Sequence, residues 1–153
     1  MYIMLSEVIA LLSPLAGASL AFALVLFARS TPPERERHIY GVGLVAAAAI
    51  YVGFAVAAGA SNRWLAVEGA GVLIYGAAAY IGVRRWQAAL AFGWAAHIAW
   101  DLLLHVNGPG STFTPYWYPW LCVGFDIGLA IAVLGIRAPR TGDAGQLPVV
   151  GDG

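Results

Sequence analysis

Three ionisable residues lie four positions apart within one apolar run of the chain: His97, Asp101 and His105. On an α-helix this spacing places the three side chains on one stripe, with Trp94 on the same side. An ionisable stripe is costly to bury in a lipid bilayer, so in a membrane span it marks a functional site by default. We therefore expect the chemistry of this protein in the run from Gly93 to His105.

The composition is that of a membrane protein rather than a soluble domain. Of the 153 residues, 61% are hydrophobic and 10% are charged, and the mean hydropathy is +0.77. The basic residues are all arginines in short clusters, which leaves no continuous basic face for nucleic acid. The single cysteine, Cys122, excludes an internal disulfide and any CxxC motif.

The apolar runs predict an all-α fold, a bundle of five transmembrane helices. A spanning helix needs roughly 20 mainly apolar residues, and five runs of about that length can be drawn. They cover residues 3–28, 38–60, 64–83, 86–106 and 118–137. We interpret residues 1–137 as a single transmembrane domain and expect the tail, 138–153, to be disordered and cytoplasmic.

The arginines predict the orientation of the bundle, because cytoplasmic loops carry the excess of positive charge. Arginines gather in the first loop, the third loop and the C-terminal flank, whereas Arg63 alone falls on the opposite side. This bias predicts an N-terminus outside and a C-terminus inside. We expect a multi-pass protein of the cell inner (plasma) membrane, which has the lipid bilayer as a partner.

The predicted orientation gathers the intramembrane acids in the outer half of the bilayer or near its midplane. These acids are Glu7, Glu68, Asp101 and Asp126. No Arg or Lys is placed to neutralise them, whereas Glu34 and Glu36 fall in a loop that we expect to be solvated. A buried carboxylate without a basic partner must be protonated, hydrogen-bonded in a wet cavity or bound to a cation. We therefore expect a polar cavity among the third, fourth and fifth helices, open to the outer leaflet.

One chemistry that suits these residues is metal binding. Carboxylates with imidazoles could hold zinc, or a two-iron or two-manganese centre. The candidate ligands are His97, Asp101, His105 and Asp126. The Glu-x-x-His spacing of di-iron carboxylate bundles is absent, so a divalent metal, zinc or iron, stays one alternative.

The other chemistry is acid–base catalysis on a lipid or isoprenoid-like substrate. A carboxyl group in an apolar site can act as a proton donor, which suits Asp101 or Asp126 with His97 or His105 as proton partner. Glu68 would be a supporting carboxylate. The candidate pocket residues are Trp94, Tyr75, Cys122 and Tyr116. Tyr51 and Tyr75 could each donate a hydrogen bond to a carboxylate, although ordinary packing is the more common role of such residues.

Other functions stay open at this point. A transporter for protons, metal ions or small solutes would use the same residue types. A non-catalytic or heme-binding subunit would use His97 and His105 as axial ligands. The loop 107–117 fits a lid over the site and a simple connector equally well. Association into a homo-oligomer is a further alternative.

Three segments carry a resemblance to a known family: Gly93 to His105, residues 116–126, and residues 64–69. In these segments the chain resembles a family of small bacterial integral membrane proteins catalogued only as a domain of unknown function. The resemblance implies a polytopic membrane protein and no particular activity. It includes, as matching motif positions without assigned roles, Glu68, His97, Asp101, His105 and Asp126.

Overall fold

The computed structural model describes the backbone of residues 2–136 and the side chains of residues 8, 9 and 11–136. Within these residues the fold is all-α. The elements are α1 (Tyr2–Arg29), α2 (Pro33–Ala57), α3 (Asn62–Arg84), α4 (Gln87–Trp100), the π-helical turn η1 (Asp101–Val106), the 3-10 turn η2 (Pro109–Thr112) and α5 (Trp117–Leu134). The side chain of Glu7 and the tail 138–153, about which the sequence made predictions, lie outside the described residues.

The five predicted spans are confirmed. Five helices are long and apolar enough to cross a membrane, the fourth of them being α4 continued by η1 over Gln87–Val106. Large apolar side chains such as Leu73 and Phe92 point outward, 76% and 72% exposed, while the acids Glu68, Asp101 and Asp126 are buried. This inverted distribution is suited to lipid rather than water as the surrounding solvent. The protein is therefore a multi-pass membrane protein.

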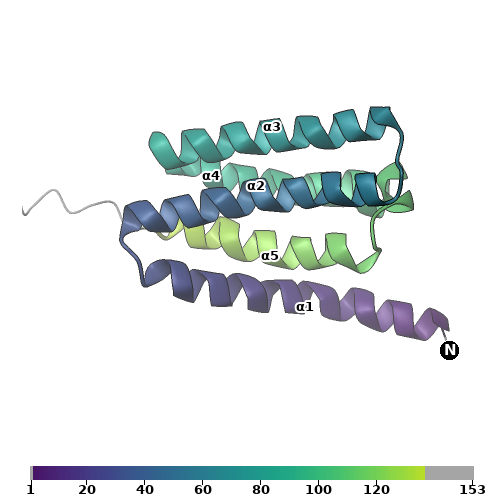
Figure 1. Ribbon diagram of the computed structural model, residues 1–153. Helices are drawn as coiled ribbons and strands as arrows, with labels where there is room; N and C mark the ends of the chain where they lie inside the picture. The colour runs from purple at the N-terminus through teal and green to yellow at the C-terminus, as the bar shows by residue number, and fades with distance from the viewer. Residues whose placement is uncertain (1, 137–153) are drawn as a thin grey trace, which may run out of the picture.

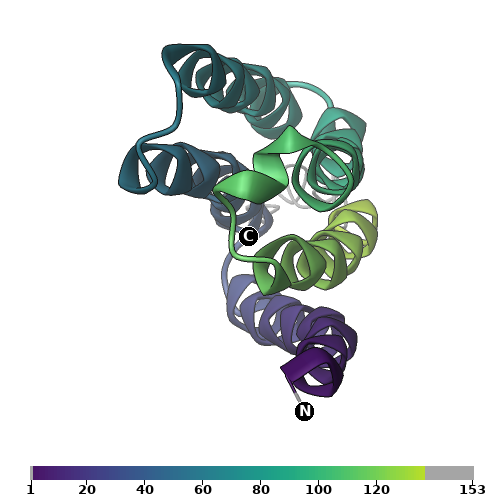
Figure 2. The same ribbon diagram turned by 90° about the vertical axis from the view of Figure 1, so that its right-hand side faces the viewer.

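The helices are arranged so that four of them surround one shared interior. In Figures 1 and 2, α2 lies against α3, α4 lies between α3 and α5, and α1 packs along the outside of α5. The α1–α2 and α3–α4 connections meet at one end of the bundle, here called the arginine end because Arg29 and Arg84 lie there. The α2–α3 connection and η2 lie at the other end, here called the η2 end.

Two glycines allow α1 and α5 to approach closely. A Cβ atom on Gly17 would collide with the carbonyl oxygen of Leu121, and one on Gly124 would collide with the carbonyl oxygen of Pro14. Small residues at such positions let helix backbones pack in a membrane, where no hydrophobic force holds them together. This contact fixes α5, the helix that carries Asp126.

The prediction that Glu36 is solvated is wrong. Helix α2 begins at Pro33, five residues earlier than expected, because proline is well suited to the first turn of a helix. Glu36 therefore lies inside the first turn and is only 7% exposed. Its Oε1 atom accepts a hydrogen bond from the Tyr40 hydroxyl over 3.0 Å and lies 3.9 Å from Nε of Arg29.

Candidate functional site

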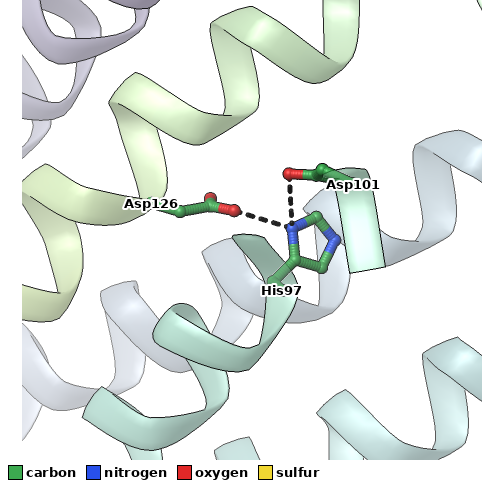
Figure 3. Close-up of side chains that lie close together, drawn as sticks. All are labelled: His97, Asp101 and Asp126. Atoms are coloured by element: carbon green, nitrogen blue, oxygen red, sulfur yellow. Dashed lines mark hydrogen bonds and ion pairs between the residues drawn. The ribbon is translucent and has the colours of Figure 1, made fainter. Parts of the chain in front are cut away.

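His97 lies between two carboxylates from different helices. Its Nδ1 atom is 2.8 Å from Oδ2 of Asp126 on α5 and 3.5 Å from Oδ2 of Asp101, which follows α4 directly (Figure 3). All three side chains are fully buried, with 0% exposure. A single imidazole nitrogen thus faces two buried acids.

Tyr51 on α2 also contacts this group of residues, through Asp101. Its hydroxyl donates a hydrogen bond to Oδ1 of Asp101 over 2.6 Å. Its ring stacks on the imidazole of His105, with centroids 3.8 Å apart and an interplanar angle of 15°. Tyr51 therefore links Asp101 to His105.

Glu68 joins this arrangement from α3. Its Oε1 atom lies 3.5 Å from Nε2 of His105, and its Oε2 atom accepts a hydrogen bond from Nε1 of Trp100 over 3.4 Å. The other imidazole nitrogen of His105, Nδ1, is 3.1 Å from Oγ1 of Thr114. Five ionisable residues thus form one connected group, here called the buried cluster: Glu68, His97, Asp101, His105 and Asp126.

The π-helical turn η1 decides which way His105 points. In this turn the amide of Asn107 donates to the carbonyl of Leu102, five residues earlier, over 3.0 Å. The wider turn rotates the side chains that follow Asp101 relative to a regular α-helix. His97 and Asp101 lie near Asp126, while His105, which follows within the turn, is directed to Tyr51 and Glu68. Such turns occur frequently at functional sites.

The segment after η1 covers the side of the buried cluster that faces the η2 end of the bundle. A Cβ atom on Gly110 would lie 2.6 Å from Nδ1 of His105, so η2 sits directly on that imidazole. The Phe113 ring lies between Trp64 and His105, with centroid distances of 5.4 and 5.9 Å. No residue of the buried cluster is more than 2% exposed. Residues 109–114 thus cover this side of the buried cluster, and the polar cavity open to the outer leaflet stays a prediction.

The buried cluster has no cationic partner from an arginine among the described residues. The ion pairs of its three acids are made with His97 and His105. Several polar atoms in it have no hydrogen-bond partner: Glu68 Oε1, His97 Nε2, Asp101 Oδ2, His105 Nε2 and Asp126 Oδ1. Because buried polar atoms normally have partners, these atoms make the buried cluster the candidate functional site.

Two of the predicted pocket residues lie against the buried cluster. Tyr75 is buried and its ring meets the imidazole of His97 edge-on, with centroids 4.9 Å apart. Its hydroxyl donates to the carbonyl of Ala96 over 3.3 Å rather than to a carboxylate. Trp94 is fully buried one turn before His97 and packs against Phe125, with ring centroids 5.7 Å apart.

The other two predicted pocket residues, Cys122 and Tyr116, differ in burial. Cys122 is buried and lines an apolar cavity of about 320 Å³, whereas Tyr116 is 49% exposed at the start of α5. Tyr118 lines the same cavity, and its ring centroid lies 5.5 Å from that of Tyr51. The remaining lining residues come from α1, α2 and α5: Leu20, Gly43, Ala46, Ala47, Ile50, Leu121 and Phe125. Tyr118 therefore separates this cavity from Tyr51, the residue that donates to Asp101.

From the sequence, Tyr51 was a weaker candidate for the functional site than the ionisable residues. Its sequence surroundings, Ile50 and Val52, do not distinguish it from a packing tyrosine. The available signal was its place in the outer half of the predicted second helix, level with the acids. Only the packing of α2 beside α4 shows that its hydroxyl reaches Asp101.

The comparisons with known proteins give a family and no activity. No curated protein and no solved structure matches the chain. Residues 11–139 match the model of a family described as a family of unknown function, DUF6010, and this range includes every residue of the buried cluster. Because the match covers most of the sequence, the chain belongs to the DUF6010 family of unknown function.

Proposed function

We propose that this protein is an integral membrane enzyme that performs acid–base chemistry on a lipid or isoprenoid-like substrate at the buried cluster. The observation that carries the proposal is the position of His97 Nδ1 between Asp101 and Asp126, at 3.5 and 2.8 Å. A histidine held between two acids can accept a proton from one and return it to the other without moving far. Protein interiors rarely hold such a group unless it has a function.

In this proposal Asp101 and Asp126 form the acid and base pair, and His97 is the proton partner. Two carboxyl groups beside one imidazole share protons rather than all being charged, because charges are costly to bury. The Tyr51 hydroxyl fixes one oxygen of Asp101 and so orients the other toward His97. His105 with Glu68 would form a second proton-holding pair on the far side of Tyr51.

The apolar cavity beside Tyr118 and Cys122 supports a lipophilic substrate. It has a volume of about 320 Å³ and is lined mostly by apolar side chains of the helices that face lipid. Binding sites for small molecules are typically apolar and carry a few convergent polar groups. An isoprenoid or acyl segment in this cavity would bring its polar or unsaturated end toward Tyr51 and Asp101.

We further propose that the η2 end of the bundle faces the outside of the cell and the arginine end faces the cytoplasm, in the inner (plasma) membrane. The support is the distribution of arginines: Arg29, Arg35 and Arg37 precede or begin α2, and Arg84 and Arg85 precede α4. The buried cluster then lies in the outer half of the bilayer. A lipid of the outer leaflet would be its source of substrate.

The rival functions fit the contacts less well. A transporter needs polar groups along the whole span, but near the arginine end Gln87 is used to bind the backbone carbonyl of Val133 and the side chain of Arg37. A bis-histidine heme site needs two facing imidazoles. His97 and His105 lie on one helix, about 12 Å apart along its axis, and each contacts different partners.

The test compares lipids from cells that carry the native gene with those from cells that lack it. Mass spectrometry of the extracted membranes should show one lipid species that changes when the gene is deleted. The wild-type gene should restore it, and genes with Asp101→Asn or Asp126→Asn should not. Glu36→Gln, which alters a buried acid at the arginine end, is the matched control and should restore it. Identical lipid profiles in all strains would overturn the proposal.

A further inference from the structure

We propose that His97, Asp101 and Asp126 bind one divalent first-row metal ion, with zinc as the first candidate. The inference deepens the proposed function, because it names the cofactor of the same site and would make the acid–base chemistry metal-assisted. It rests on three features of these residues: the spacing of their ligand atoms, their charge and the unpartnered Oδ2 atom of Asp101.

The spacing of the ligand atoms is that of a metal centre. One nitrogen or oxygen from each residue lies within 4.8 Å of the others. In a tetrahedral site with bonds of about 2.1 Å, neighbouring ligand atoms are about 3.4 Å apart. The Nδ1 atom of His97 is 3.5 Å from Oδ2 of Asp101 and 2.8 Å from Oδ2 of Asp126. These two separations lie on either side of the tetrahedral value, so small movements of the His97 and aspartate side chains would bring the ligand atoms around one ion.

The charge of the group also suits a divalent cation. Two carboxylates and a neutral imidazole carry two negative charges, which one divalent ion neutralises. Within the described part of the chain, the ion pairs of Asp101 and Asp126 involve His97 and no arginine. A neutral complex is far less costly to bury than two free carboxylates.

An unpartnered ligand atom is what a site without its ion would leave behind. Oδ2 of Asp101 is buried without a hydrogen-bond partner, whereas Nδ1 of His97 and Oδ2 of Asp126 have only each other at hydrogen-bond distance. The other oxygen of Asp101 accepts the Tyr51 hydroxyl over 2.6 Å, which is the kind of outer hydrogen bond that orients a ligating carboxylate. On binding, the ion would replace the proton shared by His97 Nδ1 and Asp126.

Three protein ligands characterise catalytic rather than structural zinc sites, because a fourth position stays open for water or substrate. His105, which the sequence included among the candidate ligands, lies outside the set. It contacts Glu68, Thr114 and the Tyr51 ring instead. It could hold a proton near the open position but does not complete the metal site.

The experiment measures the metal content of the full chain, purified in detergent without chelators and loaded separately with Zn²⁺, Fe²⁺ or Mn²⁺. Elemental analysis should find about one ion per chain for the preferred metal, and Asp101→Asn or Asp126→Asn should lower the content about tenfold or more. Glu36→Gln should retain the ion. If the variants do not fold, the test uses the wild-type protein alone. The bound metal should raise its unfolding temperature, and a chelator should reverse the rise.

The outcomes separate this inference from the proposed function. Wild-type protein that holds none of the three metals and is not stabilised by them overturns the metal site. If such a metal-free protein still converts lipid in an Asp101-dependent manner, acid–base catalysis stands alone. Protein that holds one ion through Asp101 and Asp126 but leaves every lipid unchanged keeps the metal site and overturns the proposed enzyme.

Discussion

Tyr51 and Asp101 lie fifty residues apart in sequence, and their side chains make the 2.6 Å hydrogen bond that connects α2 to the buried cluster. The same tyrosine ring stacks on His105, so one side chain contacts both parts of the cluster. Because the hydroxyl and the ring have separate contacts, substitutions can test them separately. The predictions that follow use such selective changes.

Tyr51→Phe removes the hydroxyl but keeps the ring on His105. We expect lipid conversion to fall about 10- to 100-fold, because Asp101 loses the group that orients it. The free energy of unfolding should fall by about 1–3 kcal/mol, because Oδ1 of Asp101 stays buried without its partner. Tyr40→Phe is the matched control, since its hydroxyl also donates to a carboxylate, that of Glu36, but at the arginine end. Equal losses of conversion in both variants would contradict an orienting role.

Gly110→Ala should displace η2 from the buried cluster. The added methyl group would lie 2.6 Å from Nδ1 of His105 and 2.7 Å from the carbonyl oxygen of Leu104, which is too close for any side chain. Hydrogen–deuterium exchange of the amides of residues 108–114 should therefore be faster than in the wild type. Gly76→Ala on α3, where an added methyl group meets nothing within 4 Å, is the control and should leave the exchange as it is. Unchanged exchange in Gly110→Ala would mean that the loop does not press on His105.

Gly124→Ala should loosen α1 from α5, because its methyl group would collide with the carbonyl oxygen of Pro14. We expect the free energy of unfolding in detergent to fall by about 1–3 kcal/mol, as for other overpacked interiors. The control is Gly53→Ala on α2, where a methyl group meets nothing within 4 Å. That substitution should be neutral or slightly stabilising. Similar destabilisation by both variants would contradict a specific role of the close contact at Gly124.

The proposed orientation can be checked with single cysteines in a Cys122→Ala background. Ser61→Cys lies between α2 and α3, and Ser30→Cys lies between α1 and α2. A membrane-impermeant thiol reagent added to intact cells should label position 61 and not position 30. Opened cells should allow both to react. Labelling of position 30 alone in intact cells would reverse the orientation and put the buried cluster in the cytoplasmic half.

Most of the fold was predictable because it depends on local chemistry. Runs of apolar residues broken by arginine, proline and glycine indicate spans, and the four-residue spacing correctly predicted that His97 and Asp101 face the same side. The spacing alone did not predict η1, since a π-helical turn depends on how the chain packs after Asp101. That turn directs His105 away from His97 and the two aspartates and toward Glu68.

The remaining features depend on which helices meet, which a single sequence does not contain. The burial of Glu36 follows from the early start of α2 at Pro33 and from the nearby Tyr40. The contact of Tyr51 with Asp101 requires that α2 packs beside α4. The closure of the buried cluster depends on Gly110, whose missing side chain lets η2 rest on His105.

The rate of lipid conversion by purified protein is the most direct measure of the central claim, that the carboxyl groups around His97 perform chemistry. Wild type and Asp126→Asn would be reconstituted in vesicles made from the lipids of the native host, and mass spectrometry would follow the products. The account predicts steady conversion by the wild type and a rate about 10²- to 10⁴-fold lower for Asp126→Asn, the usual contribution of a general acid or base. Equal rates for the two proteins, with equal unfolding temperatures, would contradict it.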